Sequence, residues 1–270
     1  MSDVTTWLVG PDGGIDRAAG FPPGPVSTRP AGDGSLDYYL VRPAGDGRSA
    51  RRDGGVGAPD GILVEEFVLD REHCAVRLDS AGWTAGERRW WRAAAFSRAV
   101  RSDPAVRARV VPVDRDEAAA VLRLFGGADL PDERTLRGYF RDGTPLRTAA
   151  PLRLGGEVTA GFHDTRVHRI LFANDLTPPG LADLRARWPL TVTGDLADPL
   201  ARVIGTAELR VGDDAFRWEL RRIGTVSAWC VDLTSDLAGP HDDALRPMLR
   251  QLTTAMRRQG LIPVTIERFA

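Results

Sequence analysis

The chain of 270 residues contains no lysine, only two cysteines and only four histidines. All 36 basic residues are therefore arginines, and with 37 acidic residues they give a formal net charge of −1. This balance excludes a general electrostatic attraction to nucleic acid or to an anionic membrane. A basic set made only of arginine is typical of the codon usage of a GC-rich bacterial genome, so we expect a bacterial protein.

The scarce cysteines exclude two further classes of protein. Cys74 and Cys230 are far apart and form no CxxC pair, so the sequence indicates neither a disulfide framework nor a zinc knuckle. Cys230 lies within an alternating apolar run, which favours a small buried residue over a nucleophile. The first ten residues lack the basic and apolar pattern of a signal peptide, and no apolar run is long enough to span a membrane. We expect a cytoplasmic protein without a membrane segment.

Short catalytic and cofactor motifs are also missing. The chain has no G-x-S-x-G, no H-E-x-x-H and no calcium-loop pattern. The glycines at 54, 55 and 57 follow no expected strand and lack the Lys and Ser or Thr of a phosphate-binding loop. We therefore expect no cofactor and no metal site.

The clearest pattern that is present covers residues 206–270. Polar and apolar residues alternate in three short runs, as they do in half-buried strands, and a fourth run follows a helical stretch. The helical stretch repeats its apolar residues at intervals of three and four, which gives one apolar stripe. The expected strands are 207–211, 216–220, 226–233 and 262–266, and the expected helix is 244–259. This β-β-β-α-β module predicts an α+β fold of antiparallel sheets with helices packed on one face.

Composition divides the chain into three expected parts. Residues 1–60 hold 12 of the 29 glycines and 7 of the 19 prolines, and we expect two short strands at 4–9 and 36–41 with a mobile loop at 44–61. Residues 61–155 form an α+β subdomain. Residues 156–270 form the C-terminal α+β module, which begins near a Pro- and Gly-interrupted stretch.

In the middle part, 62–69 and 74–78 are expected to form a hairpin. Thr84 and Glu87 have the spacing of a capping box, which predicts a helix from Thr84 onward that includes two tryptophans. Asp114 and Glu117 predict a second capped helix over 118–125. The remaining expected elements are a strand at 107–113, a helix at 130–140, a β-α-β run over 167–172, 177–188 and 190–192 with the two strands parallel, and a weak helix at 195–203.

One polar cluster, His163, Asp164 and His168, has residue types that suit catalysis. Histidine and aspartate can supply a general base and the carboxylate that orients it. A separation of five places the two histidines on opposite faces of a strand, so they converge only if a turn lies between them. The alternative is an ordinary hairpin with exposed polar residues. A small hydrolase or transferase that uses this cluster is therefore the second hypothesis for the function.

The favoured hypothesis depends on Arg88, Arg89, Trp90, Trp91 and Arg92. Tryptophan and arginine are enriched at binding hot spots, so these residues form the expected contact surface for a protein partner. The longer stretch Arg88–Arg109 has a local excess of arginine that could also contact single-stranded nucleic acid. Because no catalytic motif is found, we expect a non-catalytic protein-interaction module, an adaptor or accessory subunit of a bacterial multi-protein assembly.

Overall fold

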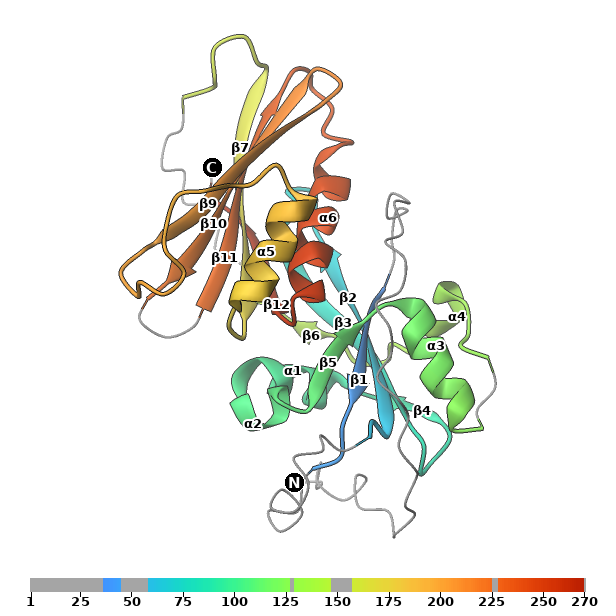
Figure 1. Ribbon diagram of the computed structural model, residues 1–270. Helices are drawn as coiled ribbons and strands as arrows, with labels where there is room; N and C mark the ends of the chain where they lie inside the picture. Colours follow the sequence, from blue (N-terminus) through green and yellow to red (C-terminus); the bar gives the residue numbers. More distant parts are fainter. Residues whose placement is uncertain (1–35, 45–57, 127–128, 147–156, 225–227, 270) are drawn as a thin grey trace.

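The computed structural model describes residues 36–44, 58–126, 129–146, 157–224 and 228–269. Two antiparallel sheets of six strands each, accompanied by helices, form the described part of the molecule (Figure 1). The predicted α+β class is confirmed. None of the helices among the described residues combines the length and the apolar composition that a membrane span requires.

Sheet A is built from the first half of the chain. Its strand order is β4-β3-β2-β1-β5, and β6 pairs with β3 beside β4. The strands are β1 (Asp37–Val41), β2 (Gly61–Leu69), β3 (Ala75–Thr84), β4 (Trp90–Arg92), β5 (Val110–Val113) and β6 (Thr144–Pro145). The helices between these strands are α1 (Ala94–Ser102), α2 (Pro104–Arg107), α3 (Arg115–Leu124) and α4 (Glu133–Arg137).

Sheet B is built from the second half, with strand order β12-β7-β11-β10-β9-β8. The strands are β7 (Asp164–Ala173), β8 (Thr191–Val192), β9 (Val203–Val211), β10 (Asp214–Ile223), β11 (Ala228–Leu237) and β12 (Ile262–Arg268). The helices are α5 (Pro178–Arg187) and α6 (Leu245–Arg258). The C-terminal β-β-β-α-β order is confirmed, but β7 lies between β11 and β12, so this module needs the earlier strand to complete its sheet.

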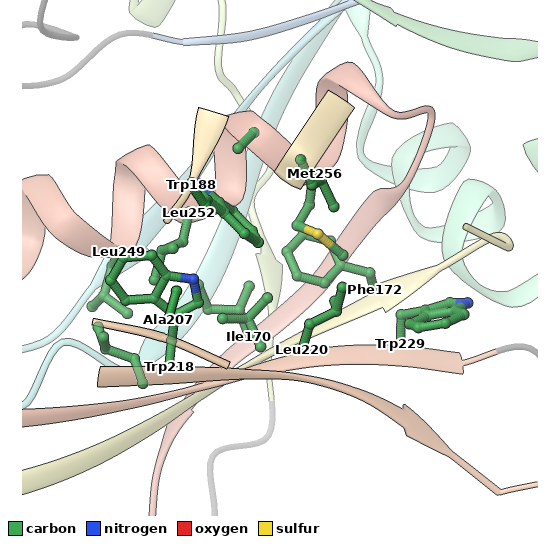
Figure 2. Close-up of a cluster of buried hydrophobic side chains, with 14 of the residues drawn as sticks. Ile170, Phe172, Trp188, Ala207, Trp218, Leu220, Trp229, Leu249, Leu252 and Met256 are labelled. Carbon is green, nitrogen blue, oxygen red and sulfur yellow. The ribbon is translucent and has the colours of Figure 1, made fainter. Parts of the chain in front are cut away.

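The core of sheet B lies between the sheet and its two helices. The apolar stripe of α6 contacts the apolar side chains of β7, β10 and β11, and Trp188 at the end of α5 meets Trp218 edge to face at 5.8 Å (Figure 2). The residues drawn in this core include Ile170, Phe172, Trp188, Ala207, Trp218, Leu220, Trp229, Leu249, Leu252 and Met256. Burial of so much apolar surface is the main stabilising term for this half of the molecule.

Sheet A is covered on both faces. Helices α3 and α4 pack on the face that carries Tyr38, Ile62 and Val64, whereas α1 packs on the face that carries Tyr39 and Leu63. The strand predicted at 36–41 and the hairpin of β2 and β3 are confirmed. The capping box of α3 is also confirmed, with both of its hydrogen bonds formed between Asp114 and Glu117.

The helix predicted from Thr84 onward is wrong. Thr84 is the last residue of β3, and Trp90 and Trp91 belong to β4, which pairs with β3 in an antiparallel hairpin. The next helix begins only at Ala94. The reason is tertiary packing, because the ring of Trp91 lies so close to Gly82 that a Cβ there would be 2.2 Å from it. The spacing of Thr84 and Glu87 fits a capping box, but the paired strands decide the structure.

Three smaller predictions also differ from the structure. Strands β7 and β8 are not neighbours, so the parallel pair predicted for the β-α-β run does not form. Residues 195–202 form turns and irregular structure in place of the predicted helix, and Val203 begins β9. The helix predicted over 130–140 is confined to α4. The strand at 4–9 and most of the mobile loop at 44–61 lie outside the described residues. Sheet A ends before residue 146 and sheet B begins after 163, and the exact domain boundaries stay a prediction.

Helix α6 joins the two sheets (Figure 1). Its apolar side lies on sheet B, while Arg250 and Arg257 on its other side form ion pairs of 2.7 and 2.9 Å with the buried Asp37 of β1. Arg257 also donates to the carbonyl oxygen of Tyr38 at 2.7 Å, and its guanidinium lies 4.6 Å from the centre of the Tyr39 ring. The sequence indicates only a helix-terminal arginine here, whereas the structure buries it between the sheets.

Candidate binding surface

Sheet B has an uncovered polar face. Strand pairing places Arg169, Asp232, Glu219 and Thr206 in one row across the sheet, on the side opposite to the helices. The neighbouring row contains Thr234, which lies between Val167 and Arg217. Among the described residues no helix packs on this face. The alternation that buries one set of side chains under α5 and α6 therefore leaves a continuous set of charged and hydroxyl side chains on the other.

Three adjoining hollows follow this face, and together we call them the trough. Their volumes are about 330, 740 and 550 Å³. The first two hollows share Arg221, and the second and third share Glu208 and Arg217, so the three lie next to one another along the sheet. Apolar residues such as Pro189, Leu200 and Phe162 form part of the lining. The remaining lining residues include Val167, Arg169, Thr206, Glu208, Arg217, Glu219, Arg221, Asp232, Thr234 and Asp236.

An ion-pair chain fixes the centre of the trough. Arg169 binds Asp232 with two hydrogen bonds of 2.6 Å, and Arg221 donates to the same carboxylate at 3.2 Å. Arg221 also lies 3.6 Å from Glu219. The hydrogen bonds that Arg169 donates to Asp232 raise the pKa of Arg169. A bidentate arginine–carboxylate pair holds both groups in one geometry, so these charges are positioned before any partner arrives.

A second group fixes one end of the trough around Asp236. This carboxylate is almost fully buried and accepts hydrogen bonds from Thr159 and Thr165 at 2.7 and 2.8 Å. Arg217 donates to it at 3.0 Å but is itself 54% exposed. The buried carboxylate of Asp236 therefore holds the side chain of Arg217 in place while that side chain remains accessible to a partner.

The residues of the predicted histidine cluster do not converge. His163 is exposed before the start of β7, whereas the ring of His168 is buried and bonds through Nε2 to the carbonyl oxygen of Glu72 at 2.9 Å. Asp164 pairs with Arg166 at 2.8 Å. Because β7 is an unbroken strand here, the turn that would bring the two histidines together is not formed.

The structure pairs His168 with a different histidine, which sequence reasoning missed. The rings of His73 and His168 lie 6.2 Å apart, and Nε2 of His73 lies 3.0 Å from a carboxylate oxygen of Asp242. Arg166 contacts the same carboxylate. These groups dock the turn between β2 and β3 onto sheet B. No local signal could have found them, because His73 and Asp242 are far apart in the sequence.

Both cysteines are unsuited to nucleophilic chemistry. Cys230 is fully buried in β11, and burial, the largest cause, raises the pKa of its thiol to about 12. Burial also raises the pKa of Cys74. Since the thiolate is the reactive form, neither group is activated. Among the described residues, no cluster of three or more His, Cys, Asp or Glu side chains is arranged to hold a metal ion.

The residues of the predicted Trp/Arg surface form the β3–β4 hairpin. Arg88, Arg89 and Arg92 are exposed, and Trp90 and Trp91 are half-buried on alternating sides of β4. Arg89 pairs with Glu87 and Arg92 pairs with Asp142, both at the surface. The ring of Trp90 stacks on Tyr139 at 5.5 Å. The hairpin thus presents arginines beside partly exposed tryptophans, but Arg88 and Arg92 do not share a helical face.

The longer Arg88–Arg109 stretch does not form one basic surface. The side chain of Arg101 is only 9% exposed and binds Glu65 with two hydrogen bonds of 2.9 and 2.7 Å. Arg107 donates to two backbone carbonyls, and Arg109 donates to the carbonyl oxygen of Arg42. These arginines stabilise the fold, so the local excess in the sequence is divided between the surface and the interior. No protein-family model, curated protein or solved structure matches the chain.

Proposed function

We propose that the protein is a non-catalytic interaction module, an adaptor or accessory subunit of a bacterial multi-protein assembly, and that a protein partner binds the trough of sheet B. The observation that supports this most directly is the set of charged side chains along the trough that ion pairs and hydrogen bonds hold in place. Rigid charged groups that need no rearrangement lower the free-energy cost of binding.

The charge pattern of the trough favours a protein over a polyanion. Arginines and carboxylates alternate along it, and the central arginines, Arg169 and Arg221, are already paired with Asp232. A nucleic-acid surface gains affinity from unpaired cations that contact phosphates. A surface with positive and negative charges in fixed positions suits a protein partner that presents the complementary charges. Such complementarity sets the specificity and the association rate.

The chemistry of nearby titratable groups supports binding over catalysis. Cys230 lies on the trough side of β11 beside Asp232 but is fully buried, whereas His168 is buried on the side of the sheet that faces the helices. Burial lowers the pKa of His168 to about 4 and raises that of Cys230 to about 12. Neither group is charged and accessible near neutral pH, as a base or nucleophile in the trough would have to be.

The β3–β4 hairpin, with Arg88, Arg89, Trp90, Trp91 and Arg92, is the second candidate contact surface for the same function. Changing Arg88 and Arg92 together to Glu reverses two exposed charges of the hairpin, one in its loop and one at the far end of β4. Surface ion pairs contribute about 0–1 kcal/mol each, so the fold should survive this change. If the hairpin is the contact surface, association slows markedly, because charge complementarity governs encounter.

A bulky side chain placed in the trough tests whether the partner binds there. Thr234→Trp fills the middle of the trough, and Thr135→Trp on the exposed side of α4 is the matched control. The partner is identified with wild-type protein by affinity purification from the bacterial host and reconstituted from purified components. We expect Thr234→Trp to weaken binding about tenfold or more, and Thr135→Trp to leave it unchanged.

The two surfaces are distinguished by the same assay. Binding that survives Thr234→Trp but is lost in the Arg88→Glu/Arg92→Glu variant would assign the contact to the hairpin. Binding that survives both changes would contradict the proposal. Circular dichroism and thermal unfolding of each variant separate a lost contact from a lost fold.

A further inference from the structure

Strand β9 presents an unpaired edge. Among the described residues, the only strand that pairs with its outer side is β8, and β8 reaches only Gly205 and Thr206. The segment Ala207–Val211 is therefore bonded to β10 on one side and to no described strand on the other (Figure 1). It contains no proline, and Leu209 and Val211 are 39% and 41% exposed. Edge strands of this kind are templates for pairing with another chain.

The hairpin geometry determines which backbone groups face outward. Gly212 and Asp213 form the two-residue turn, so Val211 and Asp214 are the closing pair and exchange backbone hydrogen bonds. Bonding alternates along an antiparallel pair, which directs the N–H and C=O groups of Val211 and Leu209 to β10. The same groups of Glu208 and Arg210 then point outward. The hydrogen bond from the N–H of Thr193 to the outward carbonyl of Ile204 follows the same alternation.

One self-pairing register satisfies both the backbone and the side chains. If two copies pair antiparallel about a two-fold axis at Leu209, Glu208 of each copy lies opposite Arg210 of the other. Both residues direct their backbone groups outward, so each pair can exchange its two hydrogen bonds. Opposite charges placed directly across a sheet are stabilising. Leu209 then meets its own counterpart, and Val211 meets Ala207, which buries the exposed apolar side chains.

The other symmetric registers are unfavourable. An axis at Glu208 or at Arg210 places like charges directly opposite each other, which is destabilising. A shift by one residue aligns outward backbone groups with groups that already bond to β10. An axis nearer to the start of β9 is blocked, because β8 occupies the outer side of Gly205 and Thr206.

We propose that the free edge of β9 is a homodimerisation site, at which a second copy of the chain adds its own β9 in the register centred on Leu209. Two copies of sheet B then form one continuous antiparallel sheet. This contact is isologous, so it closes with two copies. The paired segment is short, and we expect a dimer with a dissociation constant on the order of micromolar. Glu208 also lines the trough, but the backbone pairing takes place at the edge of β9, so Thr234→Trp in β11 should leave the dimer intact.

The test is a charge exchange within one chain, measured by sedimentation velocity over a concentration series of the purified full chain. Glu208→Arg and Arg210→Glu each create like-charge pairs twice in the dimer, and each should weaken dimerisation about tenfold or more. The double variant, Glu208→Arg with Arg210→Glu, restores opposite charges in this register and should return to within about threefold of wild type. A wild-type chain that stays monomeric, or a double variant as weak as the single ones, would overturn the proposal.

Cysteine cross-linking tests the register directly. Leu209→Cys places two cysteines opposite each other across the axis and should form a disulfide-linked dimer on mild oxidation. Val211→Cys lies opposite Ala207 in this register, so its two copies are too far apart to link. Leu200→Cys, in an exposed loop, controls for random collision. Cross-linking at Val211 but not at Leu209 would contradict the register and with it the charge argument.

Discussion

At the scale of single residues, His168 couples protonation to folding. Its ring is fully buried, and this burial, reinforced by the nearby His73, Arg268 and Arg166, lowers its pKa from 6.5 to about 4. The hydrogen bond to the carbonyl oxygen of Glu72 opposes this shift only in part. Between these two pKa values the unfolded chain binds the proton and the folded chain does not, so stability rises with pH through this window.

The stability of the protein should therefore fall on acidification before the carboxylates titrate. From about pH 7 to about pH 4.5, we expect the lowered pKa of His168 to reduce the free energy of unfolding by about 2 kcal/mol. Urea unfolding at several pH values measures this, with His168→Gln as the comparison, since glutamine keeps a donor but does not titrate. Equal pH dependence in wild type and variant would show that His168 does not make this contribution.

The same residue illustrates what a sequence can predict about a site. Strand alternation already separates His163 from His168, and the structure agrees, with one exposed and the other buried. The actual neighbours of His168, Glu72 and His73, come from a turn in the other sheet. Proximity of this kind depends on how two sheets dock, which no local pattern in the chain specifies.

At the scale of elements, apolar alternation and helix caps predict the strands and helices correctly where the local preference of the sequence agrees with the tertiary packing. The strands β9 and β10 and the helix α6 follow directly from their patterns, and the cap of α3 forms as its residues predict. The segment after Thr84 is different, because a capping-box spacing and two adjacent tryptophans fit a helix or a strand. Packing of Trp91 against Gly82 selects the strand.

Helix α6 provides the element-scale prediction. Leu249 is 1% exposed and lies in the core beneath sheet B, so Leu249→Ala should lower the free energy of unfolding by about 2–5 kcal/mol. Leu124→Ala is the matched control, since Leu124 is 75% exposed and its removal should change stability by about 0.5 kcal/mol or less. Chemical denaturation measures both. A loss well under about 1 kcal/mol for Leu249→Ala would mean that α6 does not cover the sheet as described.

At the scale of the whole molecule, the trough could not be predicted because it depends on strand order. Its polar residues were visible as the charged half of each alternating strand, as in β9 and β10. The sequence does not reveal that β7 inserts between β11 and β12, which brings Arg169 beside Asp232. Nor does it reveal which sheet face remains uncovered. In the sequence, each of these residues looks like an ordinary polar residue of a half-buried strand. Long-range strand pairing brings them together into one surface.

The same long-range order makes α6 the shared support of both sheets. Asp37 of β1 is 1% exposed and forms ion pairs with Arg250 and Arg257, while the opposite side of the helix lies in the core of sheet B. Removing one partner of a buried ion pair leaves an uncompensated charge, which typically costs about 3–5 kcal/mol. Because the helix belongs to both sheets, this loss should affect both sheets together.

Asp37→Asn tests this coupling, since it removes the charge and keeps the shape. We expect the free energy of unfolding to fall by about 3 kcal/mol or more, and hydrogen exchange to accelerate in β2 and in β10 alike. Asp142→Asn, which breaks the exposed pair with Arg92, should cost about 1 kcal/mol or less and leave both strands protected. Combining Asp37→Leu with Arg257→Met replaces one charged pair with apolar side chains and should recover part of the loss. Faster exchange confined to β2 would contradict the shared role of α6, because sheet B would then be stable without its contact to sheet A.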